Sequence, residues 1–160
     1  MTTAGNYGPG SAKRLEETAL EGIAGARAAL ETFYHSLNHR DAATLAAVWG
    51  DGPAVVLYNP LGGTVRGREA IAALYQRVFD SGLGVEVCFG DIVELAGADH
   101  ALFVGRETGS YLGAGGTRVP LSIRTSRYFR RADGTWRQHH HHGSIDDPEA
   151  LARYQAAVRG

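Results

Sequence analysis

Residues 117–144 read TRVPLSIRTSRYFRRADGTWRQHHHHGS, and this stretch predicts two antiparallel strands joined by a tight turn. Side chains alternate between two faces with period two, and Asp133-Gly134 is typical of a two-residue hairpin turn. One face of the first strand is predominantly apolar and reads as the core side, with Val119, Leu121, Ile123, Thr125, Arg127 and Phe129. The alternation therefore predicts one covered and one open sheet face.

An arginine on the core face needs a partner, because a lone buried charge costs several kcal/mol even after relaxation. For Arg127 the partner is either a carboxylate on a neighbouring strand, such as Asp91, or an anion supplied by a ligand. Arg106 shares its face with Leu102 and Val104, and the same reasoning turns it inward. Both arginines are thus candidate ligand-binding residues.

The second strand is unusual because residues 137–144 contain no aliphatic or aromatic hydrocarbon side chain. Period two puts His139 and His141 on one face of this strand and His140 and His142 on the other, so either register turns one imidazole pair inward, and a one-residue slip or bulge would exchange the pairs. A desolvated imidazole near an arginine has a lowered pKa and stays neutral near pH 7. The inward pair is therefore a candidate acid/base pair.

The remaining elements follow from the apolar periodicity of the chain. Helices are expected from about residue 16, from residue 42, over 68–79 and after residue 147, and strands over 54–59, 85–95, 100–112, 117–130 and 135–144. This order predicts an α+β fold in which N-terminal helices pack on a curved antiparallel sheet, with an extra C-terminal helix. Residues 1–12 are expected to be a disordered arm, and residues 13–160 one domain.

Composition excludes several classes of protein. The chain has 160 residues, 16 basic and 17 acidic side chains, and a single cysteine, Cys88. It therefore lacks an internal disulfide framework, a multi-cysteine zinc site and the charge of a general nucleic-acid binder. No apolar run suits a membrane span or secretion signal, so a cytoplasmic protein is predicted. No carboxylate is placed to complete a histidine metal site, and neither a metal nor a cofactor is expected.

Three segments resemble the nuclear transport factor 2-like superfamily, which includes ketosteroid isomerase, SnoaL-like polyketide cyclases and the association domain of calcium/calmodulin-dependent protein kinase II. They are Asn59–Gly62 with Gly67–Tyr75, Ser126-Arg127 with Asp133–Trp136, and His140–Ser144. The resemblance implies a cone-shaped cystatin-like fold, a conical pocket between sheet and helices, and a homodimer through the outer sheet face.

The departures from that family narrow its activity. Asn59 stands where ketosteroid isomerase has its aspartate base, and Phe33 aligns with its oxyanion-holding tyrosine unless the neighbouring Tyr34 substitutes. Steroid isomerisation is therefore disfavoured. Arg106 and Arg127 match two arginines that bind carboxylates in the kinase association domain, whereas a third position falls at Gly143. With Arg127 facing inward, this match implies that His141 and His139 line the pocket as the acid/base pair. His140, His142 and Trp136 are then expected on the opposite face.

Two hypotheses for function remain open. The first is a pocket protein for an anionic or carbonyl-bearing organic ligand, working as a cofactor-free isomerase, dehydratase or cyclase through histidine acid/base chemistry. The second is a non-catalytic ligand-binding or dimerisation module. Neither needs a nucleic acid or a membrane as partner. Further candidates for the pocket wall are Tyr34, Trp49, Tyr58 and Asn59.

Overall fold

The computed structural model describes residues 5–159. The elements in chain order are η1 (Leu15–Ala19), α1 (Gly22–His39), α2 (Ala42–Val48), β1 (Val56–Tyr58), β2 (Thr64–Arg66), α3 (Arg68–Asp80), β3 (Glu86–Ala96), β4 (His100–Leu112), η2 (Ala114–Gly116), β5 (Arg118–Ala132), β6 (Thr135–Ser144) and α4 (Pro148–Arg159). Here η denotes a 3-10 helix. Among the described residues, no helix combines the length and apolar character needed to cross a membrane.

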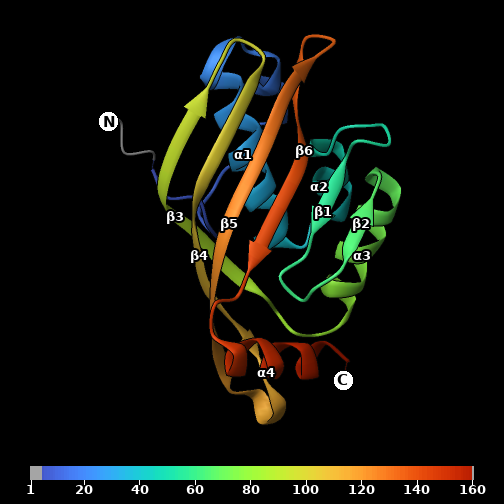
Figure 1. Ribbon diagram of the computed structural model, residues 1–160, viewed down its shortest axis with the longest axis vertical. Helices are drawn as coiled ribbons and strands as arrows, with labels where there is room; N and C mark the ends of the chain where they lie inside the picture. The colour runs from blue at the N-terminus through green and yellow to red at the C-terminus, as the bar shows by residue number, and fades with distance from the viewer. Residues whose placement is uncertain (1–4, 160) are drawn as a thin grey trace.

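A curved six-stranded sheet with the order β2-β1-β6-β5-β4-β3 forms one layer, and α1, α2 and α3 cover its concave face (Figure 1). The strands β3 to β6 form an antiparallel meander, as predicted. Asp133 and Gly134 turn the last hairpin with φ angles of 51° and 77°, the conformation that a type I′ turn requires. The α+β fold class with its extra C-terminal helix is therefore confirmed.

The predicted strand 54–59 is shorter in the structure, where only β1 is extended. β1 pairs with a second short strand, β2, which the sequence did not predict. β1 also pairs in parallel with β6, so that Leu57 lies beside His141. This pairing extends the meander by two short strands. It places the loop after β1 next to the end of β6, and residues of this loop line the cavity described below.

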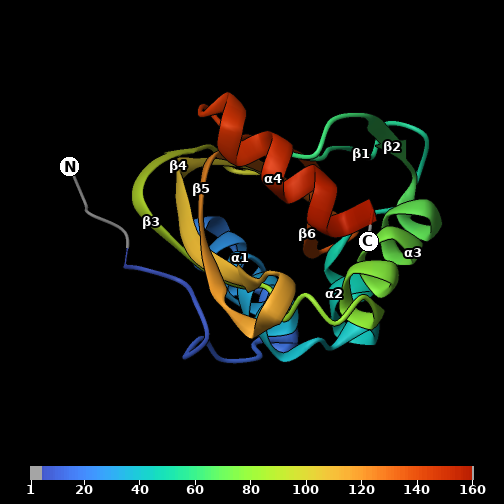
Figure 2. The ribbon, with the colours of Figure 1, turned by 90° about the horizontal axis from the view of Figure 1, so that it is seen from below.

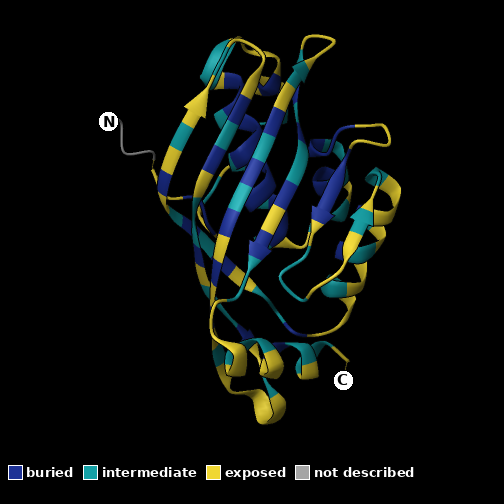
Figure 3. Ribbon diagram, viewed as in Figure 1, coloured by how far each residue is buried: buried dark blue, intermediate teal, exposed yellow. Residues whose placement is uncertain are grey.

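The alternation of β5 is confirmed, since Leu121, Ile123, Thr125, Arg127 and Phe129 are all buried (Figure 3). The prediction that Trp136 lies on the outer face is wrong, because its side chain is 1% exposed and its Nε1 donates to Leu20 O at 3.1 Å. A Cβ at Gly25 would lie 2.4 Å from the indole, so α1 approaches Trp136 this closely only because residue 25 is glycine.

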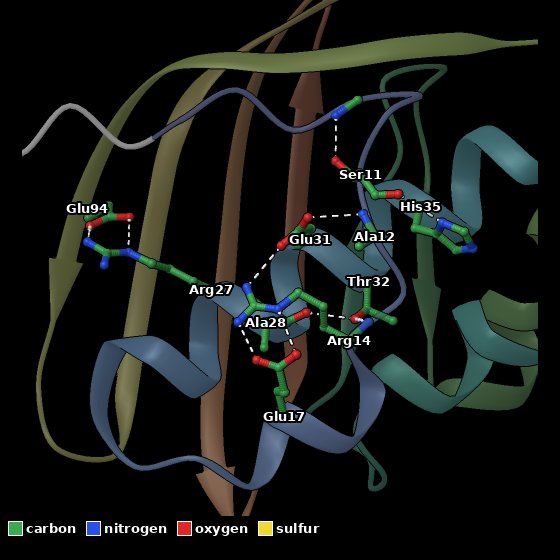
Figure 4. A network of polar contacts seen from close by, with 11 residues as sticks. Ser11, Ala12, Arg14, Glu17, Arg27, Ala28, Glu31, Thr32, His35 and Glu94 are labelled. Carbon is green, nitrogen blue, oxygen red and sulfur yellow. Dashed lines mark hydrogen bonds and ion pairs between the residues drawn. The ribbon is translucent and has the colours of Figure 1, made fainter.

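The N-terminal segment packs against the sheet and α1. Tyr7 exchanges two backbone hydrogen bonds with Phe89 on β3, and Arg14 pairs with Glu17 and with Glu31 on α1 (Figure 4). The backbone N–H of Ala12 also donates to Glu31. A disordered arm over residues 1–12 therefore does not hold for residues 5–12, while residues 1–4 lie outside the described part. Tyr7 belongs to the apolar core, which the glycine-rich composition of this segment did not predict.

Candidate functional site

A small cavity lies between the concave face of the sheet, α3 and α4. It offers about 60 Å³ to the centres of water-sized molecules. Because one water needs roughly 10–15 Å³ on this measure, the cavity holds only a few non-hydrogen atoms. Hydrocarbon side chains dominate its wall: Leu37, Leu57, Leu61, Leu74, Val78, Val85, Val87, Leu121 and Ile123. Its polar or ionisable lining residues are Asn59, Tyr75, Glu107, Arg127, His141 and Tyr154.

Arg127 is 1% exposed and donates to residues on three other elements. Its Nη2 donates to Glu107 Oε1 on β4 at 2.7 Å, its Nε to Tyr34 Oη on α1 at 2.8 Å, and its Nη1 to Gln138 Oε1 on β6 at 2.9 Å. Burial opposes its charge, but Tyr34, Glu107 and Tyr75 outweigh that effect and raise the pKa of Arg127. The guanidinium is therefore permanently charged and already neutralised within the fold.

Of the two partners left open for Arg127, the structure supplies a carboxylate, and it is Glu107. Asp91 does not fill that position, because it is exposed with a φ of 53° at the irregularity between Gly90 and Val93. Tyr34 also donates to Glu107 Oε1, at 2.6 Å. Tyr34, a predicted pocket residue, is fully buried and does not line the cavity, and burial raises its pKa well above 10.0, so its hydroxyl keeps its proton.

The prediction that Arg106 faces inward is wrong. Its guanidinium donates to Ser122 and pairs with Asp146 at 3.4 Å on the exposed outer face. On β4 the inner face is formed instead by Ala101, Phe103, Glu107 and Tyr111, with glycines between them. Leu102 and Val104 are apolar but turn outward, and this reversed the face assigned to the strand.

A bulge in β6 explains the second correction. Opposite β5, Tyr128 pairs with His140 and Phe129 with Gln138, so His139 is an extra residue in the ladder. Gln138 and His141 consequently point inward, whereas the predicted partner His139 lines a separate surface depression with Gly50 and Arg137. His139 is therefore not paired with His141 in the cavity.

His141 lines the cavity and is 3% exposed, and neither ring nitrogen has a hydrogen-bond partner in the described structure. Burial, followed by the nearby Arg127, lowers its pKa well below 6.5. The imidazole is thus neutral at pH 7, with one N–H donor and one lone pair free. An unsatisfied buried polar atom costs about 1–3 kcal/mol, which makes this histidine the outstanding polar group of the cavity.

Two further oxygens contribute to the cavity. Glu107 uses Oε1 for both of its hydrogen bonds, and its Oε2 has no protein partner among the described residues. Tyr75 lines the same space, and burial raises the pKa of its hydroxyl to about 12. Sequence reasoning missed Glu107 as a site residue. Adjacent residues of a strand point to opposite faces. An outward Arg106 would therefore have placed Glu107 on the inner face of β4.

The other pocket candidates are distributed differently. Asn59 lines the cavity, and its Oδ1 accepts from the backbone N–H of Leu61 at 2.8 Å, which fixes the loop after β1. Trp49 is fully buried and does not line the cavity, and its Nε1 has no partner in the described residues. Tyr58 is 38% exposed on the outer face, edge-on to His140 and His142. Within residues 5–159 no group of three or more metal-ligating side chains occurs.

Comparison with known proteins establishes the family. The model of the SnoaL-like domain matches residues 26–148. The chain belongs to the SnoaL-like domain family. No curated protein matches the sequence.

Solved structures share the fold. A protein from Thiobacillus denitrificans, provisionally described as a calcium/calmodulin-dependent protein kinase type II association domain, is 26% identical, with a TM-score of 0.65 over 76% of this chain and 94% of its own. One from Streptomyces avermitilis, provisionally described as a dehydratase from the NTF2-like family, is 20% identical, with a TM-score of 0.68 over 76% and 95%. An NTF2-like protein with a cystatin-like fold from Novosphingobium aromaticivorans is 21% identical, with a TM-score of 0.64 over 81% and 85%. The resemblance to NTF2-like proteins is thus confirmed.

The ion pair at the centre of this SnoaL-like domain gives the first prediction. Arg127→Met should lower the free energy of unfolding by about 3–5 kcal/mol, because it leaves Glu107 buried without its cation. The double variant with Glu107→Leu should lose less than the sum of the two single variants. Arg106→Met, which breaks an exposed pair, should cost less than about 1 kcal/mol. Urea unfolding measures all four, and strictly additive losses would contradict the coupling.

The pKa of His141 gives a second prediction. Because it is lower in the fold than the 6.5 of an exposed histidine, the unfolded chain binds a proton more readily. Stability is therefore complete above pH 6.5 and falls as the pH drops below it, by about 1.4 kcal/mol per pH unit from this group. In urea unfolding at pH 7 and pH 5, His141→Gln should flatten this slope. His139→Gln should keep most of it, and an unchanged slope in His141→Gln would refute the assignment.

Proposed function

We propose that this protein binds a small, uncharged carbonyl compound in the cavity and transfers a proton on it. The observation that carries the proposal is His141, buried in the cavity wall with both ring nitrogens free, in the same lining as Glu107. The SnoaL-like family includes ligand-binding proteins and members with isomerase or dehydratase activity. The Streptomyces avermitilis relative described provisionally as a dehydratase supports the same class of reaction.

Charge favours a carbonyl ligand over an anionic one. The positive charge of Arg127 is already paired with Glu107 at 2.7 Å inside a wall made largely of hydrocarbon. A ligand carboxylate would have to enter beside the Glu107 carboxylate, and two like charges in an apolar site are unfavourable. Arg127 is therefore proposed as a positioning residue that holds Glu107 and Gln138, rather than as an anion receptor.

The two polar groups take different roles. Histidine with a pKa well below 6.5 is a poor proton acceptor at neutral pH, so we assign His141 as the hydrogen-bond donor to the carbonyl oxygen. Glu107 Oε2, free of protein partners, takes a proton from the carbon next to the carbonyl. Returning that proton to another carbon gives isomerisation, whereas delivering it to a β-hydroxyl, which then leaves as water with the electron pair of its C–O bond, gives dehydration. Side chains alone supply this chemistry, and we propose that no cofactor takes part.

Exchange of hydrogen for deuterium next to the carbonyl tests the proposal without knowledge of the substrate. In D2O, wild-type protein should accelerate deuterium incorporation into 2-butanone, followed by proton NMR. Glu107→Gln should lose about 100-fold or more of that acceleration, since a general base contributes about 10²–10⁴-fold. His141→Phe, which keeps a ring but removes both nitrogens, should lose a comparable factor.

The matched control is Asp146→Asn. Like Glu107, Asp146 is a carboxylate paired with an arginine, but its partner is Arg106 and the pair lies on the exposed face. It should retain full exchange activity. Binding of 2-butanone with no exchange would reject the catalytic role and leave the non-catalytic binding module. Tighter binding of butanoate than of 2-butanone, lost in Arg127→Ala, would reject the uncharged ligand class.

We also propose that two copies of the chain associate through the outer sheet face. Val93, Leu95 and Val104 are 48%, 56% and 36% exposed, and Val93 pairs directly with Val104 across β3 and β4. Tyr58 lies at ring-centroid distances of 5.2 Å and 5.5 Å from two histidines further along the same face. Adjacent apolar side chains of this kind on a sheet face support a protein interface.

Light scattering after size exclusion tests the association. Val104→Arg should shift the protein from dimer to monomer, because it places a charge in the apolar part of the face. Leu20→Arg is the control, since Leu20 is 45% exposed in the turn before α1. A monomeric wild-type protein, or a Val104→Arg variant that remains dimeric, would contradict the proposed interface.

A further inference from the structure

Helix α4 closes one end of the cavity. Figure 2 shows it crossing the lower end of the molecule between the sheet and α3. Its Tyr154 is 6% exposed, lines the cavity and packs against Tyr111 of β4 with ring centroids 4.9 Å apart. Tyr154 is therefore part of the wall that limits the cavity to about 60 Å³.

A second, larger hollow lies on the other side of that wall. It runs between α4 and the β4–β5 hairpin and offers about 790 Å³ on the same measure. Its lining is predominantly apolar and includes Leu83, Tyr111, Leu112, Val119, Ala156 and Ala157. We call it the α4 groove.

One layer of side chains separates the cavity from the α4 groove. Leu83, Tyr111, Leu121 and Tyr154 form a single apolar cluster, with Val85 and Val119 packed against it. Within this cluster Leu121 and Val85 face the cavity, whereas Leu83 and Val119 face the groove. The two spaces have no lining residue in common and meet only through this cluster, in which Tyr154 of the cavity wall packs against Tyr111 of the groove wall.

The polar attachments of α4 are few. Asp147 accepts from the backbone N–H of Glu149, and Gln155 Nε2 donates to Leu61 O at 2.8 Å. Much of the helix is exposed (Figure 3). The match to the SnoaL-like domain ends at residue 148, where α4 begins, so the groove depends on a helix beyond the matched region.

We propose that the substrate has two parts: a carbonyl head that reaches His141 and Glu107, and an unbranched apolar tail that passes Tyr154 into the α4 groove. This proposal rests on the proposed function and specifies its substrate class. The cavity alone admits only a few atoms, whereas the groove next to it presents an apolar surface suited to a chain of methylenes. Tyr154 is then the residue that selects for a narrow tail at the passage between the two spaces.

A homologous series of 2-alkanones from 2-butanone to 2-nonanone tests the proposal by calorimetry. Each added methylene that enters an apolar groove should increase affinity about fourfold, so the five added methylenes should together increase it by on the order of 1000-fold. Ala156 is exposed and lines the groove. Ala156→Trp should reduce the gain in affinity for long chains and leave the affinity for 2-butanone unchanged. Ala152→Trp, exposed one turn away and outside the groove lining, should retain the full gain.

The outcomes separate this proposal from the proposed function. Affinity that stops rising after the shortest ketones, or a gain that persists in Ala156→Trp, would overturn the two-part substrate while leaving the head site intact. A full chain-length gain without any deuterium exchange would instead overturn proton transfer and support the groove. Tyr154→Ala provides a second check, because opening the passage should let branched ketones such as 3-methyl-2-octanone bind as tightly as linear ones.

Discussion

The buried charge of Arg127 is the constraint on which the concave side of this molecule depends. A guanidinium 1% exposed must be neutralised and hydrogen-bonded, and here the partners come from α1, β4 and β6 while the charge itself comes from β5. The ring of Phe33 lies 3.9 Å from the guanidinium carbon and covers one of its faces. These contacts hold three adjacent strands and the first helix in one register. They also leave a single Glu107 oxygen free.

The bulge at His139 determines what the rest of β6 presents to the cavity. In a regular strand, Trp136 and His141 would point to opposite faces, because they are an odd number of residues apart. The extra residue between them lets Trp136 pack against Gly25 while His141 also turns inward. A structural requirement at one end of the strand and a functional group at the other are thus reconciled by one inserted residue.

Sequence alone predicted the elements that carry an unambiguous period. On β5 the apolar residues fall on one face only, and Arg127 was correctly placed among them. On β4 the predicted face was wrong. Leu102 and Val104 are more apolar than the small Ala101 and Gly105 and suggested the opposite face, although Phe103 and Glu107 are the buried residues.

The remaining errors have equally local causes. Bulges such as the one at His139 are set by the pairing of a strand with its neighbours, so the residues of that strand do not reveal them. Residues 5–12 have no period at all, and Tyr7 is ordered by its pairing with β3. The identity of the carboxylate partner required knowledge of the β4 face, and this is why Glu107 was overlooked as a site residue.

The unpaired nitrogens of His141 finally bear on why the cavity exists. Each unsatisfied buried polar atom costs about 1–3 kcal/mol, and a hydrocarbon side chain at position 141 would avoid that cost in a wall already rich in leucine and valine. In the neighbouring network Arg127 donates to three partners, whereas Gln138 Nε2 and Trp49 Nε1 are also buried without a partner among the described residues, so His141 differs from them in that it lines a cavity. His141 lines the same cavity as the free carboxylate oxygen of Glu107, and a ligand that enters this cavity can supply the hydrogen bonds that His141 lacks. Since the cavity admits a few atoms and adjoins an apolar groove, a ligand with one oxygen at the end of a hydrocarbon chain is the simplest molecule that satisfies both.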